Sequence, residues 1–465
     1  MSGKLATYIV QFVFLAIYAR VFSPQDFGII ASIQVFVIFF DMLSNVGIGP
    51  AIINEDEFGK NKRNGIFSFT IILAVLISLL FYFFSYGINL FYGGYEYQDI
   101  AILVSIGILF NSANTVSNTA LVKDAKFITI AKIDILSEIL ALGGVLYLSC
   151  QGGGVIALAT KPAILSINKF IFTYIASKNT SIGRPKLGTE LSHVKSILEF
   201  SSYQFCFNFI NYFSRNLDNI LVAKFFGMNK IGIYDKSYQL MRYPLLLTTY
   251  AMTPAIQPIL TKQRHDRSII IREHNNLANR LLMISVPIST YIFTNSHEIV
   301  LFLFGNQWGE VSELIRVFCF MIPIQAVLST SGSFFQVLNK PKMLFITGLI
   351  TAAINIIAIS IGIYLGTLVN VASCLVVSFF LGFLITYHIL FSQVFYVKIK
   401  IFYFNLLVSL LWVSIPSLIY VVLQNLLVSN YEFKGVTALT INALLGGGSL
   451  IIFKSKLKQS FLKDI

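Results

Sequence analysis

The chain has 465 residues, of which 56% are hydrophobic and only 12% are charged, and its mean hydropathy is +0.76. A soluble fold needs charge to cover its surface, so this composition excludes a water-soluble globular protein. The net charge is +13. Cations accumulate in the cytoplasmic loops of membrane proteins, so this charge requires no nucleic-acid partner. The four cysteines stand singly, and neither they nor the histidines show the spacing of a metal site.

Long apolar segments follow one another along the whole chain, and each is long enough to cross the hydrocarbon core. Their apolar runs are continuous rather than alternating, which favours helices over a β-barrel. The sequence therefore predicts an all-α polytopic membrane protein with about fourteen spans. The predicted spans are 5–23, 27–53, 65–92, 99–122, 130–150, 154–177, 199–226, 231–261, 276–304, 312–338, 342–366, 369–396, 401–427 and 436–454.

The loops between these spans alternate in charge. Twenty-three cations fall on one side, against three on the other: Arg20, Lys230 and Lys434. Cations accumulate on the cytoplasmic side, so both termini are predicted to be cytoplasmic. No cleavable signal peptide is expected, and His193, His265 and His274, in the basic loops, are predicted to be solvated.

The loop lengths also bear on enzymatic activity. Every predicted outward connection has about ten residues or fewer, which disfavours a glycan polymerase or ligase with an outer catalytic domain. The long inward connections, 178–198 and 262–275, carry no nucleotide-binding fingerprint. The sequence predicts a protein that is not an enzyme and holds no cofactor.

Two local patterns recur at nearly equal offsets. Residues 19–29 resemble residues 223–233, which lie 204 positions later, and residues 90–93 resemble residues 302–305, which lie 212 later. These echoes indicate a duplicated unit of six helices. Because six is even, both copies have the same orientation in the membrane, which is a common plan for transporters with a central site. The predicted domains are an N-lobe at 1–195, a C-lobe at 196–397, and two C-terminal helices with a basic tail at 398–465.

Polar side chains form stripes on single helical faces within two predicted spans, where ionisable groups are costly and therefore suggest function. The stripe on the seventh span consists of Gln204, Asn208, Asn211, Arg215 and Asp218. The stripe on the eighth span consists of Asp235, Tyr238, Gln239 and Arg242. The alternative is that these groups only pair with one another, for example Arg215 with Asp218.

Further cations within predicted spans are Lys161, Lys169 and Arg316. They are either cavity residues or interfacial residues that reach toward water. The excess of cations suits an anionic cargo such as a phosphate or pyrophosphate. Candidates for binding a coupling proton or sodium ion are Asp41, Asp218 and Asp235.

Four segments resemble bacterial polysaccharide flippases of the Wzx type, which belong to the multidrug/oligosaccharidyl-lipid/polysaccharide exporter superfamily. They are residues 19–28 (ARVFSPQDFG), 41–53, 215–234 and 303–308 (LFGNQW). The order of these motifs along the whole chain is similar to that in the colanic-acid-type exporter subgroup. One departure is the short segment before the first span, which suggests a slightly truncated first helix or a misassigned start.

The resemblance implies a flippase that moves an undecaprenyl-pyrophosphate-linked oligosaccharide repeat unit from the cytoplasmic to the outer leaflet by alternating access. The glycan would be an O-antigen, capsule or related surface polysaccharide. The location would be the bacterial inner membrane, with the glycan polymerase and other assembly proteins as further partners.

The polar stripes then acquire expected roles. Arg215 and Arg242 are expected to bind the pyrophosphate, with Lys161 and Arg316 as further cavity candidates. Asn208, Asn211, Tyr238 and Gln239 are expected to bind sugar hydroxyls. The alternatives within the superfamily are a drug/cation antiporter, which an excess of cavity cations disfavours, and a flippase for the peptidoglycan precursor, whose cargo shares the pyrophosphate. A membrane scaffold is a further alternative.

Overall fold

The computed structural model shows an almost wholly helical chain, and its described part contains no strand. The residues that the structure describes are 2–45, 48–54, 59–190, 212–213, 216–249, 260–261, 265–426 and 435–452. They form two compact units, Met1–Gly232 and Ile233–Ile465. The predicted boundary at 195/196 lies outside the described residues, and the one at 397/398 falls just before a helix that begins at Ile399.

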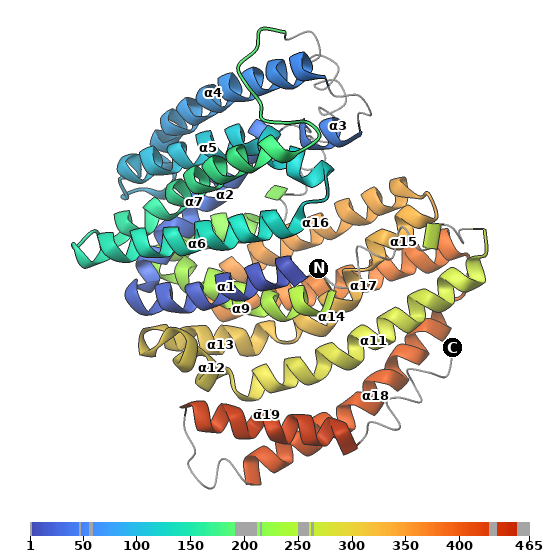
Figure 1. Ribbon diagram of the computed structural model, residues 1–465. Coiled ribbons are helices and arrows are strands. Elements are labelled where there is room, and N and C mark those ends of the chain that lie inside the picture. Colours follow the sequence, from blue (N-terminus) through green and yellow to red (C-terminus); the bar gives the residue numbers. More distant parts are fainter. Residues whose placement is uncertain are drawn as a thin grey trace. The chain divides into compact units, whose positions relative to one another are not determined.

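The first unit consists mainly of long helices, and an extended segment, 180–190, follows η1 (Figure 1). Its helices are α1 (Ser2–Val21), α2 (Pro24–Asn45), α3 (Ile48–Asn54), α4 (Lys60–Tyr92), α5 (Gln98–Lys123), α6 (Phe127–Cys150), α7 (Gly154–Ala176) and the short η1 (Ser177–Asn179). Helix α5 packs against α4 and α7, and α7 packs in turn against α6. Residues 216–226 are also helical, and α9 (Met228–Thr249) begins in this unit.

The second unit contains the rest of α9 and several broken helices. Its helices are α11 (Arg267–Thr294), α12 (Ser296–Phe304), η2 (Asn306–Trp308), α13 (Gly309–Phe318), α14 (Met321–Leu328), α15 (Ser331–Val337), α16 (Pro341–Tyr364), α17 (Leu368–Ile389), η3 (Leu390–Phe395), α18 (Ile399–Gln424) and α19 (Gly435–Ile452). The pairs α16 with α17, α11 with α18, and α18 with α19 pack side by side.

The predicted fold class is confirmed. Nine of the described helices are long and apolar enough to cross a membrane, and residues 306–318 with 321–337 form a tenth candidate, bent by 56°. Two shorter apolar helices, Leu5–Val21 and Gly435–Ile451, coincide with the first and last predicted spans. The seventh predicted span and the end of the eighth fall largely outside the described residues.

The outward faces of these helices are apolar, as contact with lipid requires. In α4, for example, Leu76, Leu80 and Phe83 are 56%, 60% and 67% exposed, whereas Ala74 and Phe81 on another face are buried. In water such exposure would be costly, but hydrocarbon tails are as apolar as these side chains. The exposure of large apolar side chains on the outer faces of the helices is therefore consistent with a protein that spans a bilayer.

Two predicted spans are not single straight helices. The ninth breaks at Asn295, and the tenth divides into shorter helices. The ninth also starts earlier than predicted, at Arg267 rather than 276. Its first turns are amphipathic, so a window that seeks continuous apolar residues misses them.

The repeated sequence patterns correspond to repeated local structure. Gly93 and Gly305 each follow the end of a helix with positive φ, +62° and +91°. Gly28 on α2 and Gly232 in the first turns of α9 lie against each other's helix. A Cβ built on Gly28 would fall 1.6 Å from the carbonyl oxygen of Met228, and one on Gly232 would fall 1.8 Å from that of Pro24. Since Pro24 and Met228 are also 204 residues apart, the contact is symmetric with respect to the repeat.

Candidate transport site

The structure describes only part of the predicted polar stripes. Asn208, Asn211 and Arg215 lie outside the described residues. Several of the remaining predicted residues belong to two polar groups, one in each unit.

The first group is a ladder of charges between α6 and α7, which we call the α6–α7 ladder: Asp134, Glu138, Lys161 and Lys169. The ammonium of Lys161 lies 3.6 Å from a carboxylate oxygen of Glu138, and that of Lys169 lies 2.8 Å from one of Asp134. The side chain of Glu138 is only 3% exposed. Carboxylates within a membrane are stable only when paired, so each lysine neutralises an acid on the neighbouring helix.

Helix α1 completes the surroundings of Glu138. Gln11 donates a hydrogen bond of 2.8 Å from Nε2 to Oε1 of Glu138. The Lys161 ammonium also lies 5.0 Å from the centre of the Tyr18 ring, within the range of a cation–π contact. Lys161 thus lies at a polar junction of three helices, with its charge compensated.

Two predicted acids of the first unit are also placed. Asn111 on α5 hydrogen-bonds to the carboxylate of Asp41 on α2. Asp218 is 6% exposed, and its Oδ1 accepts a hydrogen bond of 2.9 Å from the backbone N–H of Asn219. Both acids are held within the unit rather than on its lipid face.

The second group lies on α9. The ammonium of Lys236 bonds to Oδ2 of Asp235 at 2.9 Å and to Oε1 of Gln239 at 3.2 Å. Gln239 in turn donates to Oδ2 of Asp235 at 3.0 Å. Two predicted residues, Asp235 and Gln239, therefore form a closed triad with Lys236, which is 5% exposed.

One turn further along α9, the predicted Tyr238 and Arg242 form a different arrangement. The Tyr238 ring packs edge-on against Phe318 of α13, at 5.5 Å between centroids. The exposed guanidinium of Arg242 lies 6.0 Å from the Tyr238 ring and pairs with no carboxylate in the described part of the chain. A guanidinium without a carboxylate partner can form a bidentate interaction with an oxyanion, while the neighbouring phenol hydrogen-bonds to an adjacent oxygen.

Arg316 on α13 is exposed, and its Nε donates a hydrogen bond of 2.8 Å to Oγ of Ser296 at the start of α12. The structure thus places Arg316 near a helix break. Its fork retains further N–H donors for a ligand.

Sequence reasoning did not single out Asp134, Glu138 or Lys236. The sequence does contain a pattern that could have identified the two acids. Asp134 and Glu138 are four residues apart in the fifth predicted span, and two lysines, eight residues apart, lie in the sixth. Antiparallel neighbouring helices bring such pairs together in reverse order. Lys236 gave no comparable signal, because it lies next to Asp235 in sequence and off the predicted stripe.

Comparisons with known proteins are in keeping with this geometry. Residues 17–313 match the family described as polysaccharide biosynthesis protein. The teichuronic acid biosynthesis protein TuaB of Bacillus subtilis is 22% identical over 337 residues, which cover 72% of this chain and 69% of TuaB. The lipopolysaccharide biosynthesis protein WzxC of Escherichia coli is 20% identical over 350 residues, which cover 75% of this chain and 70% of WzxC.

The fold resembles that of a solved transporter. The lipid II flippase MurJ in an inward closed conformation superposes with a TM-score of 0.80 at 18% identity, covering 99% of this chain and 98% of MurJ. The predicted resemblance to exporters of this superfamily is confirmed, and so is the prediction of a transporter rather than an enzyme. The chain belongs to the polysaccharide biosynthesis protein family, over residues 17–313.

Proposed function

We propose that the protein is a flippase that moves an undecaprenyl-pyrophosphate-linked oligosaccharide from the cytoplasmic to the outer leaflet of a bacterial inner membrane. Its family membership and the biosynthetic names of its relatives support this proposal. The observation that carries the choice of cargo is the exposed guanidinium of Arg242, which has no carboxylate partner among the described residues.

The chemistry of the cargo explains why such a group is needed. A sugar–pyrophosphate head group loses its water when it enters a bilayer, and unless polar groups replace that water the cost is prohibitive. Arg242 would bind a pyrophosphate oxygen and Tyr238 a neighbouring oxygen or hydroxyl. The predicted Arg215, Asn208 and Asn211 would extend this set, while the isoprenoid tail stays in the lipid.

We further propose that an acid in the spans binds a coupling proton or sodium ion. Asp235 already neutralises Lys236, so its protonation would leave a buried cation uncompensated. Asp41 and Asp218 are therefore the stronger candidates.

The test is to delete the gene and measure the lipid-linked sugar pool, the surface glycan and sensitivity to cationic drugs. Loss of one surface polysaccharide, with its repeat unit trapped on the cytoplasmic leaflet, is the expected result. An unchanged glycan with new drug sensitivity would contradict the proposal and favour a drug antiporter. Arrest of wall synthesis would favour the peptidoglycan precursor as cargo.

The role of Arg242 is tested by complementing the deletion with variants. Arg242→Gln is expected to express normally and to reduce surface glycan at least tenfold, with Arg242→Lys intermediate because a point charge replaces the fork. Arg20→Gln, which removes an exposed cation at the end of α1, serves as the control. Full complementation by Arg242→Gln would show that this cation does not bind cargo.

A further inference from the structure

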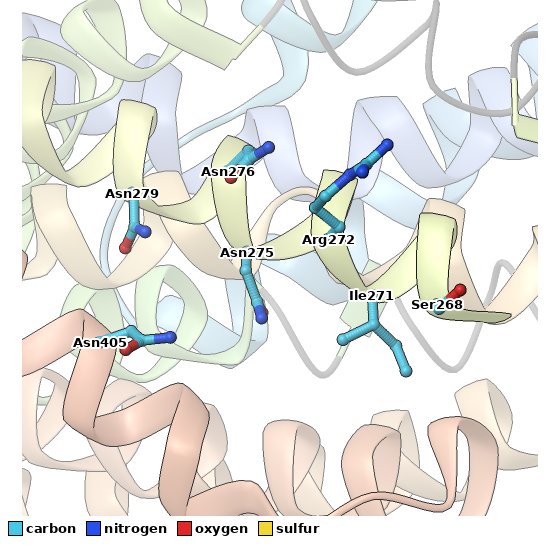
Figure 2. A pocket seen from close by; sticks show the side chains of 7 residues that line it. All are labelled: Ser268, Ile271, Arg272, Asn275, Asn276, Asn279 and Asn405. Carbon is cyan, nitrogen blue, oxygen red and sulfur yellow. The ribbon is translucent and has the colours of Figure 1, made fainter. Parts of the chain in front are cut away.

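The second unit contains a pocket of about 390 Å³ between α11 and α18, lined mainly by polar residues, which we call the α11–α18 pocket (Figure 2). Its volume falls in the range of small-molecule binding sites. The residues that line it are Ser268, Ile271, Arg272, Asn275, Asn276, Asn279 and Asn405. Asn275 and Asn279 point toward Asn405 across the gap between the two helices (Figure 2).

The lining is unusually rich in amides for a membrane-spanning helix. Asn275 contacts Nδ1 of His274 at 3.1 Å. The side chains of Asn276, Asn279 and Asn405 form no hydrogen bond with any residue that the structure describes. An amide offers both donors and an acceptor, so a row of amides without protein partners suits a ligand that carries several hydroxyls.

Cations gather at the same end of the two helices. Arg272 lies in the pocket, and its Nε is 4.0 Å from Glu273, at the limit of an ion pair between exposed side chains. Arg267 begins α11, while Lys398 and Lys400 flank the start of α18. These cations mark the predicted cytoplasmic end of both helices, and they favour an anionic group there.

The pocket also borders an apolar surface. On α18, Ile401, Phe404 and Leu411 are 65%, 66% and 65% exposed, whereas Phe402 and Ser409 on the other side of Asn405 are buried. Asn405 therefore lies at the edge between the packed face and the lipid face of the helix. A ligand held at Asn405 can keep a hydrocarbon tail along the exposed face.

We propose that the α11–α18 pocket binds the phosphorylated sugar head group of an isoprenoid lipid in the cytoplasmic leaflet, before the lipid is translocated. Arg272 binds the phosphate, while the amides of Asn275, Asn279 and Asn405 bind hydroxyls of the first sugar. The identity of the lipid as cargo rests on the proposed function.

The chain offers a natural reporter for this binding. Its two tryptophans are Trp308 and Trp412, and Trp412 lies seven residues beyond Asn405, on the same side of α18 and about 10 Å further along the helix axis. In a Trp308→Phe background, the fluorescence of Trp412 follows occupation of the pocket. The probe is a synthetic farnesyl pyrophosphate that carries one hexose, added to the detergent-solubilised full chain.

We expect saturable binding that weakens at least tenfold in Asn275→Leu with Asn405→Leu, and at least threefold in Arg272→Gln. Asn306→Leu, at an exposed position at the start of η2, serves as the control and should bind like the parent. Equal binding by the pocket variants, or no binding by the parent, would overturn the proposal.

Three competitors decide what the pocket recognises. Farnesyl pyrophosphate without a sugar, phosphatidylglycerol and inorganic pyrophosphate are each expected to bind at least tenfold more weakly than the hexose-bearing probe. Equal binding of any one of them would overturn recognition of a sugar head group and indicate a tail, structural-lipid or free-phosphate site instead.

This binding measurement involves no translocation, so it is separable from the proposed function. Binding of the probe to a protein whose deletion leaves all glycans intact would contradict the flippase alone. Loss of glycan on deletion, combined with absence of probe binding at the pocket, would contradict the pocket alone.

Discussion

His274 shows how a single side chain departs from its expected surroundings. It was predicted to be a solvated loop residue, and this prediction is wrong: it lies in α11 and is fully buried. Its ring lies between 4.8 and 5.6 Å, centroid to centroid, from five aromatic rings, those of Phe334, Tyr387, Phe391, Phe395 and Phe402. The imidazole acts here as an aromatic core residue that joins α11 to η3 and α18.

His274→Ala is therefore expected to destabilise the protein by roughly 3 kcal/mol, because it leaves a cavity among rings that cannot collapse together. Unfolding of purified protein by a denaturing detergent measures this change. His388→Ala, at an exposed position on α17, is the matched control and should be nearly neutral. Equal stability of the two variants would show that the aromatic cluster does not depend on His274.

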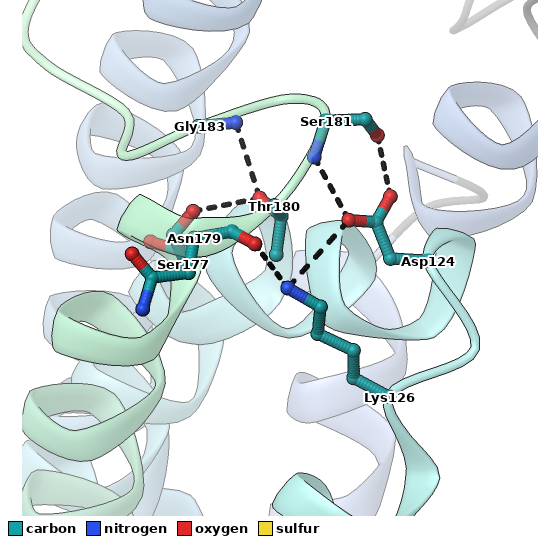
Figure 3. A network of polar contacts seen from close by, with 7 residues as sticks. All are labelled: Asp124, Lys126, Ser177, Asn179, Thr180, Ser181 and Gly183. Atoms are coloured by element: carbon teal, nitrogen blue, oxygen red, sulfur yellow. Dashed lines mark hydrogen bonds and ion pairs between the residues drawn. The ribbon is translucent and has the colours of Figure 1, made fainter.

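Asp124 holds the connection after α7 in place (Figure 3). Its carboxylate accepts hydrogen bonds from the backbone N–H of Ser181, at 2.8 Å, and from the Ser181 hydroxyl, and it lies 3.9 Å from the ammonium of Lys126. Lys126 in turn donates to the carbonyl oxygen of Asn179. Burial alone raises the pKa of Asp124, but the Ser181 hydrogen bonds and the charges of Lys126 and Lys123 outweigh it and hold the pKa below its ordinary value.

A lowered carboxyl pKa means that the stabilisation is complete above the unfolded-state pKa of about 3.9 and is lost as the pH falls through the lower folded value. Asp124→Asn is thus expected to lower the melting temperature at neutral pH, with the difference from wild type shrinking as the pH falls below the ordinary carboxyl pKa of about 3.9. Melting curves across this range provide the measurement. A difference that is constant with pH would exclude the carboxylate charge as its cause.

At the scale of helices, α2 and α9 approach each other closely at Gly28 and Gly232. Gly28→Ala is expected to prevent normal folding or to lower the melting temperature sharply, because a backbone carbonyl occupies the place of the new Cβ. Gly87→Ala, in α4, meets no atom within 4 Å and should be neutral or stabilising by up to about 1 kcal/mol. Yields of monodisperse protein and melting temperatures compare the two, and equal behaviour would refute the close contact.

Most helices could be predicted from the sequence because their apolar runs are continuous, as in α4 and α16. The start of α11 could not be predicted. Ile270 and His274 are buried there, but the polar residues Ser268, Arg272 and Asn275 interrupt the apolar run on which the prediction of a span depends. The pairing of Lys161 with Glu138 was also missed. A stripe on one helix does not show which neighbour carries its counter-charge, and that depends on packing between helices.

At the scale of the whole molecule, the orientation in the membrane is still a prediction from loop charge. Cys150 ends α6, is exposed, and lies at the predicted outward end of the fifth span. In a variant that keeps only this cysteine, a membrane-impermeant maleimide is expected to label intact cells.

The matched control introduces Ser181→Cys into a cysteine-free chain, in a predicted cytoplasmic connection where the side chain is exposed. It should be labelled only after the membrane is permeabilised. The opposite pattern would invert the topology and place the mouth of the α11–α18 pocket on the outer side.

The contact between Gly28 and Gly232 also limits how the two repeats can diverge. In most packed interfaces a larger residue on one side can be offset by a smaller one on the other, but no residue is smaller than glycine. Neither copy can therefore gain a side chain at the expense of its counterpart. A substitution at either position requires the two backbones to move apart at the same time. We therefore expect both glycines to be retained even where the rest of the two repeats diverges.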